Sequence, residues 1–78
     1  MRDLLDYILR NILGKDSKYE IIEEDDNSIV KLTIKTADDE GGMVIGKGGK
    51  VIKAIRNILR IKATLEKKKI ILLVNPVS

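Results

Sequence analysis

The chain has 78 residues, of which 44% are hydrophobic and 35% are charged, and it contains neither cysteine nor histidine. This length fits one small domain, which we place at residues 1–78, with a core over 28–75 and an N-terminal helix and strand over 2–24. Without thiolate or imidazole side chains, the commonest general base and metal ligands are missing, so we expect no enzyme, no metal and no cofactor. No apolar run approaches the roughly 20 residues of a membrane span, and we expect a cytoplasmic protein.

Charge is distributed unevenly along the sequence. Residues 1–45 carry 6 Lys/Arg against 11 Asp/Glu, whereas residues 46–78 carry 9 against 1, although the whole chain has a net charge of only +3. The basic half begins at a glycine-rich segment. Such asymmetry indicates a polyanionic partner, with a nucleic acid first and an anionic membrane surface second.

The first half of the sequence predicts a helix and two strands. Leucine and isoleucine recur at spacings of three and four over residues 2–13, which predicts an amphipathic helix with Gly14 as its stop. Residues 19–24 and 28–36 predict an antiparallel hairpin around a turn at residues 25–27. The second strand alternates Val30, Leu32 and Ile34 with polar residues, so one of its faces should meet a core.

Two helices and a strand are predicted in the second half. A short helix starts near Thr36, a candidate cap with Asp39 three residues later, and runs to Ile45 although each of its two glycines weakens it by about 1 kcal/mol. Residues 50–66 predict the most regular helix. The apolar run at residues 70–74, stopped by Asn75 and Pro76, predicts a strand that is either covered on both faces or lines a groove.

The long helix carries more apolar residues than one buried face requires. Its apolar arc covers over half of the helical wheel, and three interpretations remain open: it lines a binding groove, it forms a dimer interface, or the helix is simply well buried. Lys53, Arg56 and Arg60 follow the opposite flank. This basic stripe is either a solvated face or a continuation of an anion site.

The segment Gly46-Lys47-Gly48-Gly49 lies directly before the long helix. The first N–H groups of a helix lack intrahelical partners and carry the positive end of the helix dipole, so a phosphate can bind there if no side chain blocks it. Glycine removes that obstacle. The element order then predicts an α+β fold of order α-β-β-α-α-β, with a three-stranded mixed sheet and helices packed on one face.

The segment from Val44 to Ile52 resembles the (V/I)IGxxGxxI signature of KH domains, and the element order resembles the prokaryotic type II form of that family. The resemblance extends over essentially the whole chain, with departures at Gly41, where a larger side chain is usual, and at Met43, where a basic one is usual. It implies a bacterial, non-catalytic protein that clamps about four nucleotides of single-stranded RNA, or of single-stranded DNA, and acts as a post-transcriptional regulator or RNA chaperone.

The resemblance also implies which residues contact the nucleic acid. Backbone N–H groups of the loop would take phosphates, nearby cations would supply charge, and apolar side chains with the last strand would form a groove for the bases. The RNA-binding residues implied are Ile45, Gly46, Lys47, Gly48, Gly49, Lys50, Val51, Ile52, Lys53, Arg56, Ile70, Ile71 and Leu72. Because the chain has no Phe or Trp, it offers no large aromatic stacking platform.

Two other functions are weighed against RNA binding. The resemblance also implies a protein-interaction module that forms a homodimer, or a heterodimer with a larger Jag-type KH protein. We expect no membrane partner. A nucleotide-binding enzyme is disfavoured, because the loop lacks the G-x-x-x-x-G-K-[ST] spacing and no Ser or Thr follows Lys50 to hold magnesium.

Overall fold

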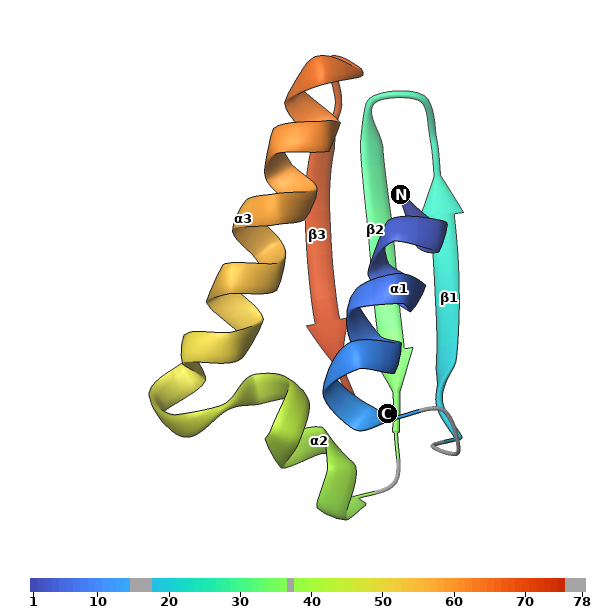
Figure 1. Ribbon diagram of the computed structural model, residues 1–78. Helices are drawn as coiled ribbons and strands as arrows, with labels where there is room; N and C mark the ends of the chain where they lie inside the picture. Colours follow the sequence, from blue (N-terminus) through green and yellow to red (C-terminus); the bar gives the residue numbers. More distant parts are fainter. Residues whose placement is uncertain (15–17, 37, 76–78) are drawn as a thin grey trace.

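The computed structural model describes residues 1–14, 18–36 and 38–75 (Figure 1). Over these ranges the elements follow the predicted α+β order, with one extra turn of 3-10 helix, η1, in the glycine loop. In chain order they are α1 (Arg2–Leu13), β1 (Glu20–Asp25), β2 (Ile29–Lys35), α2 (Asp38–Ile45), η1 (Lys47–Gly49), α3 (Lys50–Leu65) and β3 (Lys69–Val74). The predicted cap pairs Thr36 with Asp39; α2 begins two residues after Thr36, and the side chain of Asp39 lies outside what the structure describes.

The three strands form one mixed sheet in the order β1-β2-β3. The strands β1 and β2 are antiparallel, with Ile21 opposite Ile34, whereas β2 and β3 are parallel, with Leu32 beside Leu72. A parallel pair needs a long crossover, which α2 and α3 supply. All three α-helices lie on the same side of the sheet (Figure 1). The predicted hairpin, parallel pair and one-sided helical layer are therefore confirmed.

The core lies between the sheet and the helices, and its residues follow the spacing of each element. In β2 the apolar residues Val30, Leu32 and Ile34 alternate along the strand and are buried, as is Thr33 between the last two, whereas α1 and α3 bury residues four apart. The buried apolar residues are Leu5, Leu9, Ile21, Val30, Leu32, Ile34, Val44, Ile55, Leu59, Ala63 and Leu72.

The end of α1 confirms the predicted stop. Gly14 has a φ of +96°, and its N–H donates to the carbonyl of Arg10 at 3.0 Å. The helix is then tied to the chain just before β1, because the Tyr19 hydroxyl donates to the Asp6 carboxylate at 2.5 Å. This hydrogen bond lowers the pKa of Asp6, while burial, followed by the same bond, raises the pKa of Tyr19.

Only part of the apolar arc of α3 enters the core. Ile58, Ile61 and Leu65 are 46%, 66% and 80% exposed, respectively. We refer to these three side chains as the α3 apolar stripe. The interpretation of α3 as a simply well-buried helix is therefore wrong, because a one-sided layer over three strands covers only the inward face of the helix.

The last strand is also covered on one face only. Leu72 is 5% exposed and packs in the core, whereas its neighbour Ile71 is 43% exposed. Because successive side chains of a strand point to opposite faces, Ile71 lies on the sheet face that the helices leave open. The alternative in which this strand is covered on both faces is therefore wrong.

Candidate nucleic-acid interface

The loop between α2 and α3 is built by three glycines with left-handed backbone. Gly46, Gly48 and Gly49 have φ values of 77°, 66° and 77°. The N–H of Gly46 donates to the carbonyl of Gly42 at 2.8 Å, and the N–H of Gly49 donates to that of Gly46 at 3.1 Å. These bonds join the end of α2, the loop and the start of α3 into one turn of defined shape.

Gly46 is also required by close packing. A Cβ at this position would overlap the side chain of Val51 and lie 2.9 Å from its backbone nitrogen. At Gly48, by contrast, a Cβ would meet no atom within 4 Å. The first glycine therefore lets α3 fold back against the loop, while the third residue of the loop faces open space that a ligand could enter.

Among the residues that the structure describes, neither a capping side chain nor an acid in the first turn offsets the positive charge at the N-terminus of α3. Its N-cap, Gly49, provides no side-chain hydrogen bond, and the first turn contains no acidic residue. In most helices a Ser, Thr, Asp or Asn side chain satisfies these N–H groups. The partial positive charge of a 16-residue helix is therefore directed at the loop, where an anion would be stabilised.

Cationic side chains surround the same place. Lys47, Lys50 and Lys53 are exposed, and Arg56 is half-buried one turn further along α3. Within the described ranges the ion pairs are Arg10 with Asp6 and Lys68 with Asp25, so the cations beside the loop keep their charge available. The site can therefore hold phosphates through both backbone N–H groups and lysine ammonium groups.

The predicted apolar groove is only partly assembled by side chains. Ile45 is 41% exposed at the end of α2, and Val51, Ile52 and Ile70 are half-buried against the core. Met43, which the sequence prediction named only as a departure from the family pattern and left out of the binding residues, is 52% exposed in the last turn of α2. Ile45, Val51 and Ile52 therefore give the loop an apolar border, whereas Ile70 stands at the start of β3, which follows the other end of α3.

The three predicted residues of β3 do not present their side chains to one common surface. The side chain of Leu72 is buried in the core and that of Ile71 lies on the open face, so neither borders the loop together with Ile45. Among the described residues β3 pairs with β2 alone, so its other backbone edge has no neighbouring strand there. That edge is what β3 can offer to a base through hydrogen bonds.

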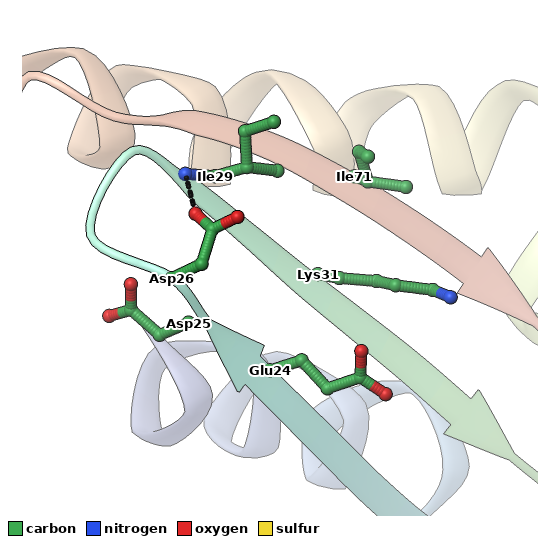
Figure 2. A pocket seen from close by; sticks show the side chains of 6 residues that line it. All are labelled: Glu24, Asp25, Asp26, Ile29, Lys31 and Ile71. Carbon is green, nitrogen blue, oxygen red and sulfur yellow. Dashed lines mark hydrogen bonds between the residues drawn. The ribbon is translucent and has the colours of Figure 1, made fainter.

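A pocket of about 240 Å³ lies elsewhere, near the tip of the hairpin (Figure 2). Three carboxylates, Glu24, Asp25 and Asp26, line it with Ile29, Lys31 and Ile71. A hydrogen bond from Lys68 lowers the pKa of Asp25, and N–H groups of Ile29 and Ser28 lower that of Asp26. The lowered pKa values keep Asp25 and Asp26 charged at neutral pH, so the pocket disfavours phosphate and is distinct from the candidate site.

A three-stranded α+β layer with a glycine loop between two helices defines the chain as a small KH-type domain. Residues 2–74 match the family model described as KhpA/KhpB, KH domain. The chain therefore belongs to the KhpA/KhpB KH-domain family, and the predicted family resemblance is confirmed.

Curated relatives agree with this assignment. The chain is 30% identical to the RNA-binding protein KhpA of Clostridium acetobutylicum over 71 residues, which cover 91% of this chain and 95% of that protein. The KhpA of Clostridium perfringens gives the same identity and coverage, and that of Chlamydia caviae is 34% identical over 76% of each chain. No solved structure matches the chain at a comparable level.

Two properties of the described residues bear on other kinds of site. None of the helices there combines the length and apolar character needed to cross a bilayer. No group of three or more acidic, histidine or cysteine side chains in these residues is arranged so that it could hold a metal ion.

Proposed function

We propose that this protein binds single-stranded RNA without catalysing a reaction, by holding about four nucleotides at the loop of residues 46–49. The observation that carries the proposal is the loop itself: three left-handed glycines at an uncapped helix N-terminus, with Lys47 and Lys50 exposed beside it. The names of the KhpA relatives support RNA as the ligand. Single-stranded DNA has the same phosphate chemistry and is a second ligand to test.

In this proposal each part of the site has a separate task. The loop and its lysines take the sugar–phosphate backbone, with Lys53 and Arg56 continuing the positive path along α3. Ile45, Val51 and Ile52 contact the bases, and the free edge of β3 around residues 70–72 supplies hydrogen-bonding groups. Because the chain has no Phe or Trp, base stacking contributes little, and a single domain binds weakly with loose sequence preference.

The clamp is tested by placing negative charge in it. We expect the double variant Lys47→Asp with Gly48→Asp to lose at least about tenfold in affinity for a short fluorescent single-stranded RNA, the equivalent of one charge-assisted hydrogen bond of about 1.5 kcal/mol. Fluorescence anisotropy measures the affinity, and circular dichroism verifies the fold.

Two controls isolate the role of charge at the loop. Gly48→Asn adds a side chain of the same shape without charge, and Lys35→Asp reverses one charge at an exposed position in β2. Both should reduce affinity far less than the double variant. If the folded double variant bound RNA with wild-type affinity, the loop would not be part of the binding site.

We further propose that the 78 residues act as one domain in the cytoplasm, as a post-transcriptional regulator or RNA chaperone. The absence of cysteine suits a reducing compartment. The pathway in which the domain acts is a question for cross-linking in cells followed by sequencing of the attached RNA.

A second candidate function is self-association, or association with a larger KH protein, through the α3 apolar stripe. Its members are spaced three and four residues apart, as are Lys53, Arg56 and Arg60 on the basic flank. Since successive helical residues lie about 100° apart, Arg60 and Ile61 place the two stripes on different flanks of α3. A partner on the apolar stripe therefore leaves the basic flank free.

Sedimentation equilibrium tests this association. We expect the wild type to form a dimer and Ile61→Lys to be a monomer with an unchanged melting temperature, because Ile61 is 66% exposed and contributes little to folding. The matched control is Ile71→Lys, which removes an exposed isoleucine from the open sheet face and should leave the dimer intact. A wild type that stays monomeric at several hundred micromolar would contradict the homodimer.

A further inference from the structure

Asn75 joins the ends of two parallel strands. It directly follows β3, where its backbone has a φ of 43°, and its N–H extends the β2–β3 ladder by donating to the carbonyl of Ile34 at 2.8 Å. Its side chain then makes two hydrogen bonds to Thr36. The N–H of Thr36 donates to Oδ1 at 2.7 Å, and Nδ2 donates to Oγ1 of Thr36 at 2.8 Å. The amide thus holds the chain where it leaves β2 for α2.

The first turn of α2 rests directly on this amide. Gly41 is buried, and a Cβ there would lie 2.5 Å from Nδ2 of Asn75 and 3.3 Å from Oγ1 of Thr36. Contacts of 2.5 Å are not possible, so a side chain at position 41 would displace either the helix or the amide. Asn75, Thr36 and Gly41 therefore form one clasp that sets how closely α2 approaches the end of the sheet.

The position of α2 is transmitted to the loop. This helix has eight residues, about 12 Å in length, and it ends at Ile45, next to Gly46. Since the N–H of Gly46 is bonded to the carbonyl of Gly42, the loop continues the last turn of the helix. A tilt of α2 at its base therefore moves the glycine loop with it.

We propose that Asn75 is a positioning residue for nucleic-acid binding: through its bonds to Thr36 and its contact with Gly41, it aims the loop of residues 46–49. This inference rests on the proposed function of that loop. Asn75 itself touches no ligand in this scheme. It acts from the far end of α2 by fixing the orientation of the helix that carries the loop.

The test measures two quantities: the amide NMR signals of the loop in the free protein and the affinity for RNA. In Asn75→Ala we expect the amide ¹H–¹⁵N signals of Gly46, Gly48 and Gly49 to shift, and the affinity for single-stranded RNA to fall about fivefold, as for the loss of one hydrogen bond. Asn75→Asp should restore both, because its carboxylate still accepts from the Thr36 N–H and can accept from the Thr36 hydroxyl.

Gly41→Ala provides an independent arm. Alone, it should shift the same glycine signals and weaken binding to a similar extent. Added to Asn75→Ala, it should weaken binding little further, because the shortened residue 75 vacates the space that the new methyl group needs. If Asn75→Ala does not fold, Gly41→Ala with the same two measurements decides the matter.

Tyr19→Phe is the control for a general loss of stability, since it removes a part-buried side-chain hydrogen bond at the opposite edge of the sheet. It should leave the glycine signals and the affinity unchanged. Unshifted glycine signals and an affinity within twofold of wild type in folded Asn75→Ala would overturn the proposal, as would equal shifts in Tyr19→Phe. If the wild type bound no RNA, the proposed function would fail, while the glycine signals would still report whether the clasp orients the loop.

Discussion

At the scale of single residues, Gly46 and Gly48 share a positive φ but differ in ψ and in surroundings. Gly46 has a ψ of 169°, which places it in a region that essentially only glycine occupies, whereas Gly48 has a ψ of 18° and open space around it. We expect Gly46→Ala to lower the free energy of unfolding by about 3 kcal/mol, and Gly48→Ala to lower it by about 1 kcal/mol.

Urea unfolding followed by circular dichroism measures both glycine variants. The larger loss at Gly46 combines backbone strain with the overlap against Val51, while the smaller loss at Gly48 is strain alone. Equal losses in the two variants would mean that the turn relaxes around the new methyl group, and that close packing at Gly46 does not define the loop.

At the scale of an element, α3 shows opposed requirements of stability and binding. An acidic residue in the first turn stabilises a helix by about 0.3–1 kcal/mol, yet the first turn of α3 has none. We therefore expect Lys50→Glu to raise the free energy of unfolding by a few tenths of a kcal/mol. The same change should weaken RNA binding at least tenfold, because it replaces a cation beside the proposed phosphate site with an anion.

Lys62→Glu is the matched control for that change, because it introduces the same charge difference in the last turn of the same helix. There the negative charge meets the negative end of the dipole, so the free energy of unfolding should fall while RNA affinity changes little. Urea unfolding and fluorescence anisotropy on both variants give the comparison. If Lys50→Glu lowered both the free energy of unfolding and the RNA affinity, the absence of an acidic residue from the first turn of α3 would be due to a structural need and not to the ligand.

At the scale of the whole molecule, three aspartates make folding depend on pH. Hydrogen bonds from Tyr19, Lys68 and the backbone of Ile29 are the largest causes that lower the pKa values of Asp6, Asp25 and Asp26, respectively. A carboxyl whose pKa is lower in the folded state binds fewer protons there than in the unfolded state. Its contribution is therefore complete above the unfolded value of about 4 and is lost as the pH falls through the folded one.

We accordingly expect the free energy of unfolding to be level between about pH 6 and 8 and to decline below about pH 4. Urea unfolding across this range measures the decline. Asp26→Asn keeps an oxygen that can accept from the Ile29 N–H but cannot titrate, so it should make the acid decline shallower. An unchanged pH profile in that variant would show that Asp26 is not among the groups responsible.

Local patterns in the sequence predicted the helices and strands. Contacts between distant segments could not be predicted in this way. The spacing of two in β2 and of four in α3 follows from how each element meets the core, and Gly14 is recognisable as a helix stop. The apolar run of β3 has no alternation, so nothing in it showed that Ile71 and Leu72 face opposite ways. The pairing of Thr36 with Asn75 joins residues 39 positions apart, which no local pattern records.

The exposed apolar stripe of α3 has a consequence for long RNA. Two copies joined through Ile58, Ile61 and Leu65 would carry two glycine loops in one dimer. The basic flank of each α3 would remain exposed to solvent. Once one loop held a strand, the other would meet the next stretch of the same strand at an effective concentration set by the spacer, in the millimolar range for short flexible links. Two loops that each bind weakly would then hold one RNA strand tightly. The dimer would select RNA by its length and by the spacing of its unpaired segments.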